Sequence, residues 1–106
     1  MSDAVVLTDD PRDHPGVRVV TLHRPAARNA FDTALYRATA AALDGARADD
    51  GVKVVVVTGA GPAFSAGQDL DEMARLAAGE PGEFGFPVLL AALKAFVLEN
   101  RCDIGI

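Results

Sequence analysis

The sequence offers little for disulfide bonding, aromatic packing or membrane insertion. Cys102 is the single cysteine, so one chain cannot form a disulfide, which fits a reducing compartment such as the cytoplasm. Tryptophan is absent and aromatic residues make up only 6%, so the core must be built from small and aliphatic side chains. No apolar run reaches the length of about 18 residues that a membrane-spanning helix needs. The first three side chains carry no positive charge, which argues against a secretory signal.

Positive charge is also scarce. Lysine and arginine together number 10 against 15 aspartates and glutamates, and the cations are scattered along the chain. This balance disfavours nucleic-acid binding, which needs a clustered basic face. His14 and His23 have no neighbouring cysteine or histidine cluster, so no metal site is expected. The length of 106 residues, with 50% hydrophobic and 24% charged residues, is typical of a folded chain of one domain at most.

The pattern of apolar residues predicts an α/β arrangement. Residues 5–8 and 17–22 read as two strands that could pair antiparallel, separated by a loop rich in Asp, Pro and Gly. Asp32 is a good N-cap for a helix over residues 33–48, whose apolar residues recur at helical spacing. The four valines 54–57 predict a strand buried on both faces, as in parallel sheets. A strand, a helix and a second strand in this order form a crossover unit.

Two more helices are expected in the second half of the chain. A short helix is predicted over residues 69–78, after a glycine-rich loop over residues 59–67. A connector rich in Gly and Pro then leads to a third helix, which begins near Pro87 and runs for about 12 residues. That helix is apolar on nearly every side, so we expect it to be buried nearly all round.

The chemistry is expected where the valine strand ends, in residues 54–72. Ligands of open α/β sheets bind beyond the carboxyl ends of the strands, and a helix N-terminus adds free N–H groups with partial positive charge. Gly67 allows a tight turn just before the predicted helix. The backbone N–H of Gln68 would then point outward, which suits an oxygen that gains negative charge during a reaction.

Three other motifs fit this segment less well. Thr58-Gly59-Ala60-Gly61 resembles the start of a nucleotide-binding loop, but the third glycine of that fingerprint falls on Phe64. A nucleotide-binding oxidoreductase therefore stays a less favoured alternative. A phosphate-binding P-loop would need lysine where Gln68 stands, and a nucleophile elbow around Ser65 would need glycine where Ala63 stands.

Two segments have distinctive sequences. They are residues 63–70, Ala-Phe-Ser-Ala-Gly-Gln-Asp-Leu, and residues 23–31, His-Arg-Pro-Ala-Ala-Arg-Asn-Ala-Phe. Both resemble the signatures of one family, the crotonase or enoyl-CoA hydratase/isomerase superfamily. Their order and spacing also match, and the resemblance spans about residues 17–94. It implies a crotonase-like ββα spiral within the α/β class, and a cytoplasmic enzyme of fatty acid metabolism acting as a lyase or isomerase. It further implies an acyl-CoA or enoyl-CoA substrate, no separate cofactor, and a homotrimer or hexamer.

The resemblance also implies roles for individual residues. The backbone N–H of Gln68 would be one of two oxyanion-hole donors that hold the thioester carbonyl oxygen. The coenzyme A thioester would lie along the following residues: Ala66, Gly67, Gln68, Asp69, Leu70 and Asp71. Ala26, Ala27 and Arg28 would meet its nucleotide end, where a guanidinium pairs well with phosphate. Phe64 would pack beneath the loop.

The tail over residues 95–106 departs from the family pattern. In the family, the second N–H donor and the catalytic carboxylates follow the third helix, so residues 1–106 are interpreted as the N-terminal portion of one crotonase-like domain. Asp69, Asp71 and Glu72 are expected to stabilise the first turn of their helix through its dipole rather than to replace those carboxylates. The alternative from another class is a catalytically inactive fragment that acts only in binding or oligomerisation.

Overall fold

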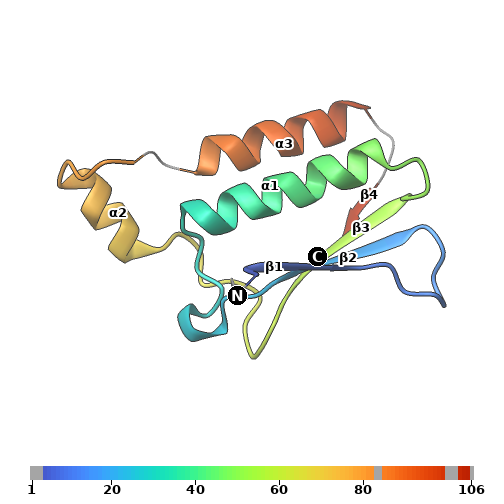
Figure 1. Ribbon diagram of the computed structural model, residues 1–106, viewed down its shortest axis with the longest axis horizontal. Coiled ribbons are helices and arrows are strands. Elements are labelled where there is room, and N and C mark those ends of the chain that lie inside the picture. Colours follow the sequence, from blue (N-terminus) through green and yellow to red (C-terminus); the bar gives the residue numbers. More distant parts are fainter. Residues whose placement is uncertain (1–3, 83–84, 100–102, 106) are drawn as a thin grey trace.

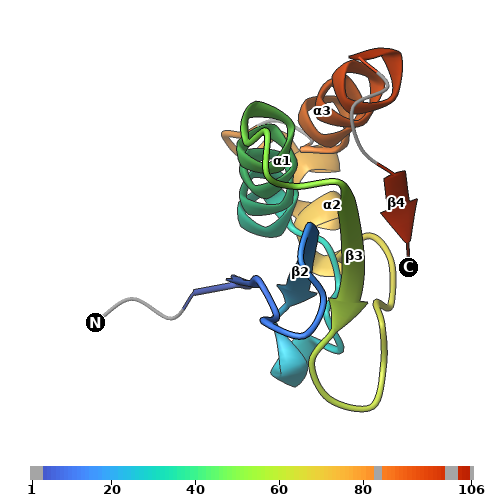
Figure 2. The same cartoon turned by 90° about the vertical axis from the view of Figure 1, so that its right-hand side faces the viewer.

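Helices cover one face of a small sheet, as Figures 1 and 2 show. The computed structural model describes residues 4–82, 85–99 and 103–105, of which residues 96–99 and 103–105 are described by their backbone only. The sheet has four strands in the order β1-β2-β3-β4. The elements along the chain are β1 (Val6–Asp9), β2 (Val17–Leu22), the 3-10 helix η1 (Pro25–Ala27), α1 (Thr33–Ala48), β3 (Val54–Gly59), α2 (Leu70–Ala77), α3 (Phe86–Glu99) and β4 (Asp103–Gly105).

The pairing of the strands confirms the predicted α/β unit. β1 lies antiparallel to β2, and β2 lies parallel to β3 with Val19 opposite Val56. α1 connects the two parallel strands and starts where predicted, because the Asp32 carboxylate accepts a hydrogen bond from the Leu35 N–H at 2.9 Å. The carboxyl ends of β2 and β3 therefore lie side by side, and the chain segments that follow them emerge at the same edge of the sheet.

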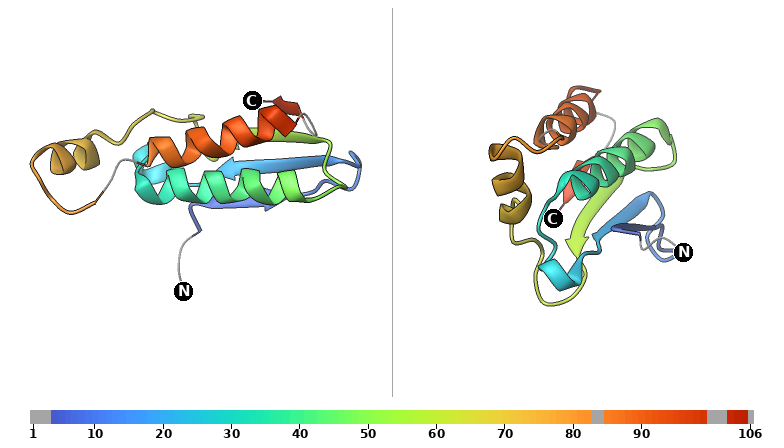
Figure 3. Two further views of the ribbon diagram at one scale, coloured as in Figure 1. Left: turned by 90° about the horizontal axis from the view of Figure 1, so that it is seen from above. Right: turned by 60° about the vertical axis from the view of Figure 1, so that its left-hand side comes forward.

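The core is aliphatic, as the composition requires. Val20 of β2 and Val55 of β3 are completely buried against Leu43 and Ala46 of α1. Ala92 of α3 completes this cluster, so α3 packs onto α1 through a small residue. Figure 3 shows α1 and α3 side by side and α2 beyond one end of the pair.

The prediction that residues 54–57 are buried on both faces was wrong. Val55 is buried, but Val54, Val56 and Val57 are only half-buried. The reason is visible in Figure 2, where α1 and α3 lie on the same side of the sheet. Alternate side chains of a strand point to opposite faces, so Val54 and Val56 lie on the face that no described helix covers, whereas Val57 lies on the same face as Val55 and packs against the core.

The third helix begins near Pro87 as predicted, but the expectation that it is buried on nearly every side was wrong. α3 begins at Phe86 and runs to Glu99, longer than predicted, and Phe86 is 51% exposed while Ala92 is buried. One face of α3 meets α1, and the opposite face lies open among the described residues. β4 falls in the tail, where no strand was predicted. Cys102, for which no disulfide was expected, lies outside the described residues. No described helix is long and apolar enough to cross a membrane.

Candidate functional site

The two signature segments lie against each other at the carboxyl end of the sheet. The N–H of Phe31 donates to the carbonyl oxygen of Gly67 at 2.6 Å, and the N–H of Asp69 donates to the carbonyl oxygen of Phe31 at 2.7 Å. These bonds make a short parallel bridge between Phe31 and Gln68. A third bond joins the Ala66 N–H to the Arg28 carbonyl oxygen at 2.9 Å. Segments that are about 40 residues apart in sequence are thereby held in one register.

The bridge determines the direction of the Gln68 backbone. Because Gly67 and Asp69 turn their bonding groups toward Phe31, the N–H of Gln68 between them turns to the other side. Among the described residues, no hydrogen-bond acceptor meets that N–H. Gly67 has a φ of 93°, in the left-handed region that glycine adopts without strain, so the predicted turn is confirmed.

Asn29 connects the loop after β3 to the segment after β2. Its side chain is completely buried, and its Nδ2 donates to the carbonyl oxygens of Ala60 and Ala63, both at 2.9 Å. Its Oδ1 accepts from the N–H of Arg24 at 2.7 Å. At Gly59 a side chain would collide with the carbonyl oxygens of Ala63 and Phe64, so the loop folds tightly back over the strand end.

Six of the sequence-predicted site residues line one cavity of about 450 Å³. They are Ala27, Ala66, Gln68, Asp69, Leu70 and Asp71, and the cavity is completed by Ala30, which the sequence did not single out. Ala26 lines a neighbouring cavity of about 490 Å³, which Ala27 also borders. Gly67 and Arg28 line neither cavity; Gly67 turns the chain beside the first one, and the Arg28 side chain is exposed. The ligand-binding role of all these residues stays a prediction.

A charged cluster closes one side of this region. The Arg24 guanidinium donates to Asp69 at 3.1 Å and to the carbonyl oxygen of Ala30 at 2.6 Å, and it lies 3.5 Å from Asp32. Asp69 also caps α2, because its carboxylate accepts from the Glu72 N–H at 3.0 Å. The predicted stabilisation of the first helical turn is thus confirmed for Asp69. That backbone hydrogen bond, followed by the bond and charge of Arg24, lowers the pKa of the Asp69 carboxyl.

Most of the chain matches the model of one protein family. Residues 12–99 fit the model of the enoyl-CoA hydratase/isomerase family. The chain belongs to this family. It is 41% identical over 80 residues to 2,3-dehydroadipyl-CoA hydratase of Escherichia coli, covering 76% of this chain and 31% of that protein. It is 37% identical over 79 residues to enoyl-CoA hydratase EchA19 of Mycobacterium tuberculosis, covering 72% of this chain and 30% of that protein.

Solved structures agree with this assignment. The structure of enoyl-CoA hydratase EchA8_6 from Mycobacterium marinum is 48% identical, with a TM-score of 0.75 over 88% of this chain and 44% of that one. The fold is therefore the crotonase-like fold that the sequence signatures predicted. The chain spans about a third of the length of the curated relatives named above.

The nucleotide-binding alternative does not fit this family member. A dinucleotide loop leads from its strand directly into a helix, whereas here β3 ends at Gly59 and α2 begins only at Leu70. No group of three or more metal-binding side chains gathers among the described residues.

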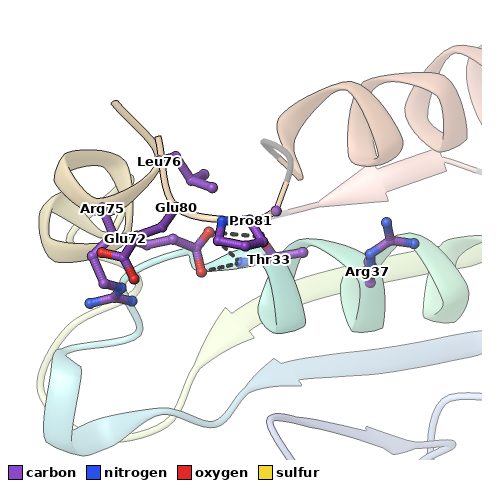
Figure 4. Close-up of a pocket in the computed structure, with 8 residues that line it drawn as sticks. Thr33, Arg37, Glu72, Arg75, Leu76, Glu80 and Pro81 are labelled. Carbon is purple, nitrogen blue, oxygen red and sulfur yellow. Dashed lines mark hydrogen bonds between the residues drawn. The ribbon is translucent and has the colours of Figure 1, made fainter. Parts of the chain in front are cut away.

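Some features of the candidate site were not predicted from the sequence, or were predicted wrongly. Phe64 was expected beneath the loop but is 44% exposed; the loop is held instead by the Asn29 side chain, which donates to the carbonyl oxygens of Ala60 and Ala63. Glu72 reaches away from its own helix, and its carboxylate accepts from the N–H and the hydroxyl of Thr33 at 2.8 and 2.7 Å. Figure 4 shows this contact in a separate cavity of about 620 Å³, which none of the predicted site residues lines.

The charge of Asp69 should make the stability of the protein depend on pH. Its pKa in the folded state lies below the ordinary value of 3.8, so its contribution is present above about pH 4 and is lost as the pH falls through the lowered pKa. We expect the loss in free energy of unfolding caused by Asp69→Asn to be largest near neutral pH and to shrink in acid. Urea unfolding at a series of pH values measures this. Asp71→Asn makes the same charge change at an exposed neighbour and is the control; a loss for Asp69→Asn that stays constant into acid would contradict the prediction.

Proposed function

We propose that this chain binds an acyl-CoA thioester and polarises its carbonyl group through the Gln68 N–H. One observation carries the proposal. Gln68 lines the cavity and lies within the family's signature segment, and its backbone N–H has no hydrogen-bond partner among the described residues. A thioester that loses an α-proton, or is attacked at its β-carbon, gathers negative charge on its carbonyl oxygen. A fixed N–H donor stabilises that charge more than it stabilises the neutral substrate. The named relatives, a 2,3-dehydroadipyl-CoA hydratase and an enoyl-CoA hydratase, support a CoA thioester as the ligand.

The reaction proposed for the family member is the hydration of an enoyl-CoA or the movement of its double bond. Asp69 and Glu72, two carboxylates near Gln68, are engaged with Arg24 and Thr33. A group held in such bonds is poorly placed to transfer protons to a substrate. The role we assign to the described residues is therefore to bind the thioester and to stabilise its charge. Assembly into trimers or hexamers and a cytoplasmic location stay predictions.

The proposal is tested by comparing two ligands by calorimetry. Acetoacetyl-CoA readily forms an enolate that places charge on the thioester oxygen, whereas acetyl-CoA does not. We expect both to bind and acetoacetyl-CoA to bind more tightly. Circular dichroism must first show that the sample is folded; if a folded sample gives no heat with either ligand at millimolar concentration, the proposal is wrong.

Arg28 should contribute affinity at the nucleotide end of the ligand. Its side chain is exposed and has no ion pair among the described residues, and it sits next to Ala27, which borders both cavities. We expect Arg28→Ala to weaken acetoacetyl-CoA binding about tenfold, the effect of one charge-assisted bond to phosphate. Binding of the acetoacetyl thioester of N-acetylcysteamine, which lacks the nucleotide, should not change.

A matched control keeps this prediction specific. Arg12→Ala removes the same charge from the loop between β1 and β2, at the opposite end of β2 from the site. It should leave the affinity for acetoacetyl-CoA unchanged. Equal losses for the two variants would show that only the overall charge of the protein matters, and would remove Arg28 from the proposed site.

The second candidate function is assembly without catalysis. It is favoured by apolar side chains that the described residues leave open, above all Leu70, which is 69% exposed, and Phe86. Such side chains are common where a chain meets a partner. Gel filtration with light scattering distinguishes the cases, since a monomer that unfolds cooperatively and binds the thioester would contradict a purely associative role.

A further inference from the structure

The hydroxyl of Tyr36 lies against the residue that carries the proposed donor. Tyr36, in the first turn of α1, donates a hydrogen bond from its hydroxyl to Oε1 of Gln68 at 2.9 Å. The Nε2 of Gln68 donates to the carbonyl oxygen of Asp69 at 3.2 Å. Because a carbonyl oxygen can only accept, the amide nitrogen must face Asp69 and the amide oxygen must face Tyr36. The two bonds together leave the Gln68 side chain with one orientation.

The ring of Tyr36 is itself held firmly. Tyr36 is only 7% exposed, and its ring centroid lies 4.8 Å from that of Phe31 and 6.1 Å from that of Phe86. The backbone of Gly85 comes so close that a β-carbon there would lie 2.7 Å from the Tyr36 β-carbon. A ring packed on several sides places its hydroxyl at a fixed point. Phe31, one of the packing partners, also forms the backbone bridge to Gln68.

The surroundings keep Tyr36 a hydrogen-bond donor. Burial raises the pKa of the Tyr36 hydroxyl above its ordinary value of 10.0, and the nearby negative charge of Glu72 raises it further. The hydroxyl therefore stays protonated at neutral pH. Glu72 is anchored to Thr33 on the same first turn of α1, as Figure 4 shows, so the start of α2 is tied to this turn as well.

We propose that Tyr36 is a positioning residue for the Gln68 N–H. Its hydroxyl holds the Gln68 side chain, and the bond from that side chain to the Asp69 carbonyl oxygen restricts the backbone on the C-terminal side of the Gln68 α-carbon. The peptide unit that carries the Gln68 N–H is held on its other side by the bond from the Phe31 N–H to the Gly67 carbonyl oxygen. This inference rests on the proposed function, and it adds a residue that does not line the cavity. A donor held still before the substrate arrives stabilises developing charge better than one that must first be ordered.

The first test removes only the hydroxyl. Tyr36→Phe keeps the ring and its packing, so circular dichroism and the unfolding midpoint report whether the fold is intact. We expect the preference for acetoacetyl-CoA over acetyl-CoA to fall about fivefold, as for the loss of one ordinary hydrogen bond. Affinity for coenzyme A itself, which has no thioester carbonyl, should not change. An unchanged preference would overturn the inference.

The second test asks whether Tyr36 acts through Gln68. Gln68→Met keeps the backbone N–H and a similar shape but removes the acceptor, so it alone should reproduce the fivefold loss expected above. In the Gln68→Met background, Tyr36→Phe should then have no further effect. An equal additional loss in that background would show that Tyr36 acts by another route, and would overturn the inference. Gln68→Met leaves Tyr36 in place. If Tyr36→Phe does not fold, the Gln68→Met variant alone still tests the inference, because it removes the same hydrogen bond from the other side.

The third test needs no ligand and separates this inference from the proposed function. Nitrogen-15 relaxation of the ligand-free protein measures how rigid each backbone N–H is. We expect the Gln68 order parameter to lie near the rigid value of about 0.85 and to fall in both single variants. An unchanged order parameter would overturn the inference even if no thioester binds. Failure of the wild-type protein to bind either thioester, with the order parameter falling as expected, would overturn the proposed function instead.

Discussion

Replacing Gln68 with proline should nearly abolish the preference of this chain for acetoacetyl-CoA over acetyl-CoA. Proline has no N–H, and the loss of one oxyanion-hole donor in comparable sites costs about 3 kcal/mol, or roughly a hundredfold. Among the described residues that N–H bonds to no acceptor, so its removal breaks none of the hydrogen bonds shown within the protein. Proline, like alanine, also lacks the side chain that bonds to the Tyr36 hydroxyl and to the Asp69 carbonyl oxygen. The stability of Gln68→Pro should therefore fall about as far as that of Gln68→Ala, while its loss of charge stabilisation is much larger. Calorimetry with the two ligands and thermal unfolding measure the two effects.

The control for this substitution is Gln68→Ala, which keeps the N–H and loses the side chain. It should show the smaller, roughly fivefold loss expected from releasing the Tyr36 hydrogen bond. The preference for acetoacetyl-CoA should be far lower in the proline variant than in the alanine variant, and modestly lower in the alanine variant than in the wild type. This order separates the effect of the backbone N–H from the effect of the side chain that Tyr36 holds. If proline and alanine behave alike, the backbone N–H contributes nothing and the proposed function loses its central observation.

Elements defined by local signals could be predicted closely from the sequence. α1 starts and ends at the predicted residues because Asp32 supplies a cap and the apolar stripe has helical spacing throughout. β2 also matches, since its alternating side chains lie between clear turn signals. The burial of Val54 to Val57 could not be predicted, because a continuous apolar run does not say whether one or both faces of the sheet are covered.

The candidate site also has parts that could be predicted from the sequence and parts that could not. The position of Gln68 and its neighbours could be predicted, because they lie in a local pattern of a strand, a glycine turn and a helix start. The contacts that hold these residues could not be predicted, because the partners are far apart in sequence: Tyr36 and Gln68 lie 32 positions apart, and Thr33 and Glu72 lie 39 apart. Helical spacing places Tyr36 on the inward side of α1 but does not say which residue its hydroxyl meets. Such partners depend on how the loop after β3 packs against the start of α1.

The largest effect on stability is expected at Asn29. Asn29→Ala would leave one backbone N–H and two carbonyl oxygens, all of them partly buried, without the partner that Asn29 supplies. An unsatisfied buried group costs about 1–3 kcal/mol, and partly buried groups lie at the low end of that range, so we expect a total loss of about 3 kcal/mol in the free energy of unfolding. The φ of 57° adds to this loss, because asparagine tolerates the left-handed region better than alanine does. Urea unfolding measures the change.

Two further variants show whether hydrogen bonding is the cause. Ser65→Ala removes a hydroxyl that donates to the Asn29 carbonyl oxygen at 2.7 Å and accepts from the Gly67 N–H at 3.0 Å. Because the Gly67 N–H is exposed and can bond to water instead, the substitution should cost only about 1 kcal/mol. Asn29→Asp has nearly the same shape but places a carboxylate against the carbonyl oxygens of Ala60 and Ala63. Burial beside two acceptors raises the pKa expected for that new carboxyl, so the loss relative to the wild type should be largest at neutral pH and smaller in acid, where the protonated group can donate. If Asn29→Ala costs no more than Ser65→Ala, the loop is held by other contacts, and the fixed position of Gln68 must be explained without Asn29.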